Sequence, residues 1–174
     1  SRLVETGAGE VHMYDGPGRG ELPTVVVIHG LGSNAASFMR TLTRLQRSAR
    51  RVVAPEILGH GMSPEPSAQL SPDSAFQAMR ELLVAQLDGP AILFGNSLGG
   101  AVAVQLAARR PDLVASVTLI SPALPSRRLR RDTAHMPVIA IPGVGERLVR
   151  RYLELDPALR AKVDGKIGVL VPAE

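Results

Sequence analysis

Residues 91–104 read AILFGNSLGGAVAV, and this stretch decides the fold. The apolar run at its start predicts a buried strand, and the apolar pattern after residue 100 predicts a helix. Between them, Ser97 stands at the centre of a tight turn, with Gly95 and Gly99 two residues to either side. A strand, a glycine turn with a central serine, and a helix form the context of a G-x-S-x-G nucleophile elbow, whose sharp turn leaves little room for flanking side chains. A plain glycine-rich corner and a phosphate-cradling loop are the alternative interpretations.

The helix expected after Ser97 strengthens the catalytic interpretation. Its first backbone N–H groups and the positive end of its dipole would point to the place where an oxyanion forms. Ser97 is therefore the candidate nucleophile.

Composition limits the class of protein. The 174 residues are 45% hydrophobic but only 3% aromatic, which predicts one globular domain with an aliphatic core. Because the chain has no cysteine, disulfides, thiolate catalysis and thiolate metal sites are excluded. No apolar run approaches the roughly 20 residues of a membrane span, and no signal peptide is visible at Ser1. A cytoplasmic location is the default expectation.

The net charge of +4 is unevenly distributed. Basic and acidic residues balance over residues 1–120, so the whole excess lies in residues 121–174. The arginines at positions 127, 128, 130 and 131 raise the alternative of nucleic-acid binding. Because no aromatic residues are interleaved with them, we expect a solvated basic surface and no nucleic-acid partner.

Alternating strand and helix patterns predict an α/β fold with a mostly parallel sheet and flanking helices. Predicted strands cover residues 10–14 (an outer strand), 24–28, 51–55, 91–94 and 117–120, and residues 15–22 are predicted to form a loop. One helix is expected around Phe38, Leu42 and Leu45, capped by Ser33 or Ser37. A second helix begins at Ser71, which caps it, and has a buried stripe of Phe76, Met79, Leu83 and Leu87.

Four polar residues follow directly after predicted strands: His29, Glu56, Ser97 and Ser121. Sites in parallel sheets lie at the carboxyl ends of the strands. We therefore expect these residues to converge on one rim of the sheet.

Three motifs in this order and spacing resemble the α/β-hydrolase superfamily, in particular its capped serine hydrolases. They are HGLG at residues 29–32, LGHGMS at residues 58–63 and GNSLGG at residues 95–100, and residues 107–122 resemble the link into the family's sixth strand. The resemblance implies that residues 1–122 form the amino-terminal part of the hydrolase core. Residues 123–174 would then form an incomplete segment of a helical cap.

The resemblance also implies roles for individual residues. Ser97 would be the nucleophile, and the backbone N–H groups of Leu98 and Leu31 would form the oxyanion hole. Gly30 and Gly32 would let the oxyanion loop approach closely, and His60 would shape its own loop. The supporting residues are His29, which holds the oxyanion loop, Gly30, Gly32, Gly95, Asn96 and Gly99.

The chain departs from the family's pattern in two places. Glu56 and Leu58 stand where the family usually has Asp and Pro. The family's order is nucleophile, acid, histidine, yet after Ser97 the only histidine is His135. Neither His135 nor the later acids lie in a suitable context: Asp132, Asp156 and Asp164. We therefore expect a chain truncated before the acid and the histidine of the triad.

These observations predict a serine hydrolase that forms an acyl-enzyme on Ser97. The expected substrate is a small, mostly apolar ester, lactone, thioester or vinylogous diketone, and transfer of the acyl group to another acceptor is a variant of the same chemistry. No metal or organic cofactor is expected. The alternative is a catalytically incomplete, hydrolase-like binding domain or an inactive fragment. The oligomeric state is left open.

Overall fold

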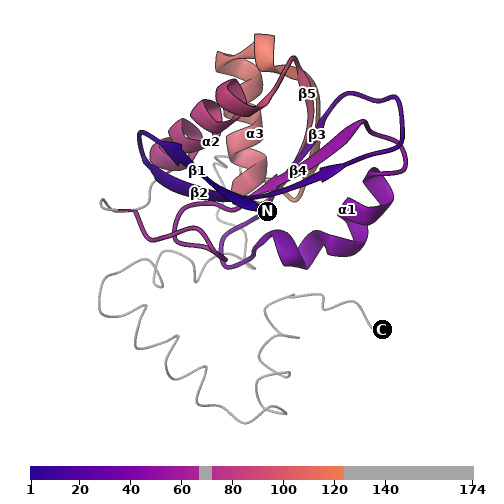
Figure 1. Cartoon of the computed structure of the whole chain (residues 1–174). Coiled ribbons are helices and arrows are strands. Elements are labelled where there is room, and N and C mark those ends of the chain that lie inside the picture. Colours follow the sequence, from indigo (N-terminus) through magenta and orange to yellow (C-terminus); the bar gives the residue numbers. More distant parts are fainter. Residues whose placement is uncertain (67–71, 124–174) are drawn as a thin grey trace. The chain divides into compact units, whose positions relative to one another are not determined.

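In the described residues, 1–66 and 72–123 of the computed structural model, six strands form one mixed sheet in the order β1-β2-β4-β3-β5-β6 (Figure 1). The strands are β1 (Arg2–Thr6), β2 (Gly9–Pro17), β3 (Val25–Ile28), β4 (Arg51–Pro55), β5 (Ala91–Asn96) and β6 (Val114–Ile120). β4, β3, β5 and β6 run parallel, whereas β1 and β2 are antiparallel to their neighbours. The mostly parallel α/β sheet predicted from the sequence is confirmed.

Helices cover both faces of this sheet (Figure 1). The helical segments are η1 (Ala35–Phe38), α1 (Met39–Leu45), α2 (Pro72–Gln86), α3 (Leu98–Arg109) and η2 (Pro111–Leu113). α2 and α3 pack on one face, against strand residues such as Val26, Ile28 and Leu93. α1 packs on the other face, against Val25 and Val27. Because successive strand residues point to opposite faces, both sides of β3 are apolar.

The buried stripe of α2 is confirmed. Phe76, Met79 and Leu83 are buried, and Leu87 packs against the same core. The predicted cap at Ser71 lies outside the described residues, as does the predicted helical cap segment after residue 123. Within the described part of the chain, no helix has the length and hydrophobicity needed to cross a membrane.

Two predictions about the amino-terminal region were wrong. β2 is not an outer strand, because β1 pairs with its free side. Residues 15–17, predicted to start a loop, continue β2 because they pair with β4 as far as Arg51. The Arg51 guanidinium holds this end through two hydrogen bonds of 2.8 Å to the Asp15 carboxylate, and it also donates to the Gln86 carbonyl oxygen at 2.6 Å. The hydrogen bonds and charge of Arg51 lower the pKa of Asp15.

The predicted helix after β3 forms as η1 followed by α1, but its cap is neither Ser33 nor Ser37. Asn34 has extended backbone, and its side-chain oxygen accepts a hydrogen bond from the Ser37 amide at 3.2 Å. Asparagine is among the preferred residues at this position because its short side chain reaches an amide of the first turn.

The turn between β5 and α3 requires glycine at both flanking positions. A Cβ atom on Gly99 would lie 2.2 Å from the Ile28 carbonyl oxygen, and one on Gly95 would lie 2.6 Å from the Gly100 Cα atom. Since both contacts are with backbone, no side-chain movement could relieve them. The steric reason for the G-x-S-x-G pattern, expected from the sequence, is therefore present in the structure.

We expect Gly99→Ala to lower the free energy of unfolding by about 1–3 kcal/mol, because the new methyl group must push α3 away from the end of β3. Gly89→Ala is the matched control, since a Cβ atom there meets nothing within 4 Å. The control should change stability by less than about 0.5 kcal/mol. Urea denaturation measures both values, and equal stabilities of the two variants would contradict the packing argument.

Candidate active site

Ser97 is the single residue between β5 and α3, and its backbone is strained. Its φ of 49° and ψ of −113° place a non-glycine residue at positive φ, which costs on the order of 1–3 kcal/mol. Four hydrogen bonds hold its peptide groups: the amide donates to Ile120 O at 3.0 Å, and the carbonyl accepts from the amides of Gly100, Ala101 and Ala123 at 2.8–3.2 Å. The surrounding chain therefore fixes a conformation that serine would otherwise avoid.

The rim predicted from the sequence is also present. His29, Glu56, Ser97 and Ser121 directly follow the last residues of β3, β4, β5 and β6, four parallel strands. Ser121 has a positive φ of 43°, and it lies between residues 120 and 123, which both bond to the Ser97 backbone. Asn96, predicted as a supporting residue, donates from Nδ2 to the Ile120 carbonyl oxygen at 3.3 Å.

The loop after β3 lies against Ser97. A Cβ atom on Gly30 would come within 2.9 Å of the Ser97 Cβ atom, so the predicted close approach is found at Gly30. The same reason does not hold for Gly32, where a Cβ atom would meet nothing within 4 Å; its φ of +71° is what favours glycine there.

The two amides predicted to form an oxyanion hole belong to the residues that directly follow Gly30 and Ser97 in the chain. Leu98 is the first residue of α3, so its N–H group has no acceptor one turn earlier in the helix. Among the described residues, no backbone or side-chain acceptor of the chain binds the Leu31 amide. The Leu31 side chain is 52% exposed beside it.

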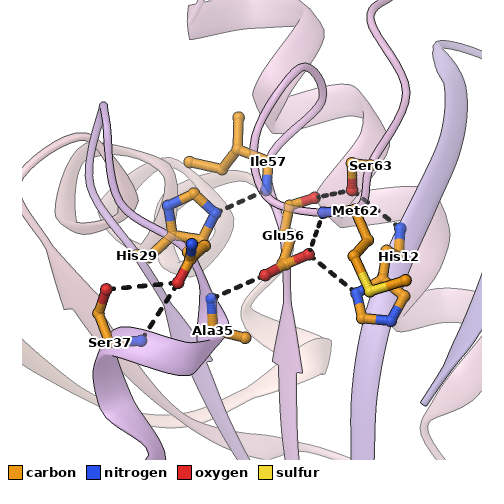
Figure 2. A network of polar contacts seen from close by, with 9 residues as sticks. His12, His29, Ala35, Ser37, Glu56, Ile57, Met62 and Ser63 are labelled. Atoms are coloured by element: carbon orange, nitrogen blue, oxygen red, sulfur yellow. Dashed lines mark hydrogen bonds and ion pairs between the residues drawn. The ribbon is translucent and has the colours of Figure 1, made fainter. Parts of the chain in front are cut away.

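His29 holds the loop that carries Leu31, as its resemblance to a structural histidine implies. The ring is buried, and its Nδ1 atom lies 2.7 Å from the Gly30 carbonyl oxygen. Its Nε2 atom lies 2.9 Å from the Ile57 amide (Figure 2). Because an amide can only donate and a carbonyl can only accept, Nδ1 carries the proton and Nε2 accepts. Both ring nitrogens are used, so His29 is not available as a general base.

Burial is the main cause that lowers the pKa of His29, and the bond to Gly30 opposes it only in part. His60 lies nearby, with ring centroids 5.4 Å apart, and its Nδ1 lies 3.1 Å from the Leu58 carbonyl oxygen of its own loop. This contact agrees with the predicted role of His60 in shaping that loop.

Sequence reasoning missed a buried network around Glu56. Its carboxylate accepts hydrogen bonds from the amides of Ala35 and Met62 and lies 2.9 Å from His12 Nδ1 (Figure 2). The position of Glu56 directly after a predicted strand indicated that it lies at the rim of the sheet. Nothing in the sequence pointed to His12 as its partner, since the two residues are 44 positions apart.

No general base can be assigned among the described residues. Within residues 1–66 and 72–123, no histidine hydrogen-bonds to the Ser97 hydroxyl, and no three His, Asp or Glu side chains gather to hold a metal ion. The other candidates considered from the sequence lie outside the described residues: His135, Asp132, Asp156 and Asp164.

Comparisons with known proteins identify the family. The sequence model described as "alpha/beta hydrolase fold" matches residues 23–160, which is more than half of the chain. The chain therefore belongs to the alpha/beta hydrolase fold family, a family of hydrolases.

Among curated relatives, Lipase LipV of Mycobacterium tuberculosis is 41% identical over 100 residues, covering 58% of this chain and 37% of the relative. A pimeloyl-[acyl-carrier protein] methyl ester esterase of Neisseria meningitidis is 32% identical over 158 residues, covering 85% and 48%. The chain thus spans less than half the length of either relative. A crystal structure of a putative ancestral haloalkane dehalogenase shares the fold, with a TM-score of 0.76 at 20% identity, over 95% of this chain and 63% of that one.

The buried neutral state of His29 predicts a pH dependence of stability. Its pKa is lowered from 6.5 in the folded protein, so the unfolded chain binds the proton more readily. The contribution of His29 is therefore fully present above about pH 6.5 and is lost as the pH falls toward the folded-state value. Protonation would also place an Nε2–H group against the Ile57 amide.

We expect the free energy of unfolding of the wild type to fall between about pH 7 and about pH 5. The fall should be shallower in His29→Gln, because the glutamine at this position does not titrate. Urea denaturation at a series of pH values measures both slopes. Identical slopes would show that His29 is not the source of the effect.

Proposed function

We propose that this protein is a serine esterase in which Ser97 is the nucleophile. The observation that carries the proposal is the strained Ser97 backbone at the turn from β5 to α3, with the Gly30 backbone packed against it. Strain of this kind is kept where the surrounding structure imposes it, and such positions cluster at active sites. A plain glycine corner has no need of a serine at positive φ.

The proposed reaction has two halves. Ser97 Oγ attacks the carbonyl carbon of an ester, its proton passes to a general base, and the alcohol leaves with a proton, so that an acyl-enzyme remains. Water then attacks the acyl carbon, regenerates the Ser97 hydroxyl and releases the carboxylic acid. Donation from the Leu98 and Leu31 amides would stabilise the oxyanion in both halves, where loss of one donor typically costs about 100-fold to 1,000-fold in rate.

Within this proposal, the general base is a residue of the whole protein that does not belong to residues 1–66 or 72–123. The described histidines support this assignment because none bonds to the Ser97 hydroxyl, and both ring nitrogens of His29 are occupied.

An ester with a mostly apolar acyl group is the substrate class we favour. The relatives include a lipase and a methyl ester esterase by name. Leu31 and Met62, on the loops after β3 and β4, are 52% and 71% exposed, which gives the loops at this rim apolar surface. The same chemistry extends to lactones, thioesters and vinylogous diketones.

The test is labelling of the purified protein with a fluorophosphonate, which reacts only with an activated serine. We expect the label on Ser97 by peptide mapping and none on Ser97→Ala. The same variant should lose at least about 1,000-fold in the rate of p-nitrophenyl butyrate hydrolysis. Ser48→Ala, an exposed serine before the amino end of β4, is the matched control and should react like the wild type.

A folded wild-type protein that takes no label and hydrolyses no ester would contradict the proposal. That result would instead favour the catalytically incomplete binding domain.

A further inference from the structure

Two consecutive residues after β4 hold both ends of the loop that carries Leu31. At one end, the Ile57 amide donates to His29 Nε2 at 2.9 Å. At the other end, the Ala35 amide donates to the Glu56 carboxylate at 3.0 Å. Residues 30–34 therefore span two fixed points that belong to the neighbouring strand's loop (Figure 2).

The Glu56 side chain is a rigid anchor. It is only 4% exposed, and its carboxylate meets three donors: the Ala35 amide, the Met62 amide at 2.7 Å and His12 Nδ1 at 2.9 Å. Burial alone would raise the pKa of Glu56, but these hydrogen bonds outweigh it and lower the pKa. The carboxylate is thus ionised at neutral pH, and three donors from separate segments of the chain bind it.

His12 on β2 and Ser63 on the loop after β4 hold Glu56 in place. The Ser63 hydroxyl donates to the Glu56 carbonyl oxygen at 2.7 Å and accepts from the His12 amide at 2.9 Å. His12 Nε2 is buried and has no hydrogen-bond partner among the described residues. A buried nitrogen without a partner destabilises the folded state. The bond from Nδ1 to Glu56 is therefore the only polar stabilisation that the described residues give to this ring.

From this arrangement we infer that Glu56 is a positioning residue for the oxyanion hole. Its carboxylate would fix the Leu31 amide by way of Ala35 while the Ile57 amide fixes the other end of the loop. The inference rests on the proposed function for the role of the Leu31 amide, whereas the clamp itself consists of contacts in the structure. An oxyanion donor must stand 2.7–3.1 Å from the developing charge, so a loop displaced by about 1 Å loses much of its effect.

Glu56→Gln tests the inference because it keeps the size of the side chain. A carboxamide has one acceptor oxygen. In Glu56 the Oε2 atom meets two donors, the Met62 amide and His12 Nδ1, whereas Oε1 meets only the Ala35 amide. The single oxygen therefore keeps the side with two donors, and the NH₂ group faces the Ala35 amide, which is itself a donor. We expect kcat for p-nitrophenyl butyrate to fall about 10-fold to 100-fold while KM changes less than about threefold, since the hole acts mainly in the transition state. Hydrogen exchange of the Ala35 amide should become faster.

Glu81→Gln is the matched control. Glu81 also accepts a hydrogen bond from a loop amide, that of Gly7, but it does so from α2. We expect kcat and the exchange of the Ala35 amide to be unchanged in this variant.

Ala35→Pro is a second variant in case Glu56→Gln fails to fold. It deletes the Ala35 N–H group and leaves the Glu56 carboxylate in place. Proline is tolerated at the first position of a helix, and the extended backbone of Asn34 suits the residue before it. This variant should show the same loss of kcat.

Several outcomes would overturn the inference. One is a folded Glu56→Gln protein with wild-type kcat, and another is a loss of activity that only follows the loss of folded protein. A wild-type protein without esterase activity or label would refute the proposed function, and the clamp would then be judged by exchange alone. Unchanged exchange of the Ala35 amide in Glu56→Gln would refute the clamp whatever the activity.

Discussion

The contact between the first turn of α3 and the end of β3 is the constraint on which the rest of this structure depends. The Gly99 backbone lies so close to the Ile28 carbonyl that the helix can only begin directly beneath the sheet rim. That start forces the chain to reverse within one residue, and Ser97 takes the strain. The same closeness brings the loop after β3 against the serine. A turn with larger residues would separate the loop after β3 from Ser97.

The sequence predicted the parallel part of the fold well, because its signals are local. β-branched runs marked β3 and β4, and the spacing of Phe76, Met79 and Leu83 marked the buried face of α2. The turn at Ser97 could be predicted because close backbone contacts exclude side chains at the two flanking positions, which leaves glycine at both. The convergence of the rim residues followed from the direction of parallel strands alone.

The rest depended on contacts between distant residues, which a single sequence does not encode visibly. The extension of β2 through Pro17 comes from pairing with β4. Asn34, and neither of the expected serines, is the cap because it stands directly before the first residue of η1. The partnership of His12 with Glu56 joins a strand and a loop through a buried carboxylate. In the sequence, only its place after a strand and its departure from the family's pattern distinguish Glu56.

The ion pair between Arg51 and Asp15 has a consequence for how such a protein can change. Arg51 begins β4 and Pro55 ends it, so the ion pair and the rim lie roughly 13 Å apart along the strand. Substitutions at sites so separated, with no shared partners, affect stability independently. Exposed rim side chains such as Leu31 and Met62 can therefore be exchanged while the ion pair at the other end of β4 still holds the pairing of β2 with β4. Substrate preference in this architecture can diverge without a matching change in the fold.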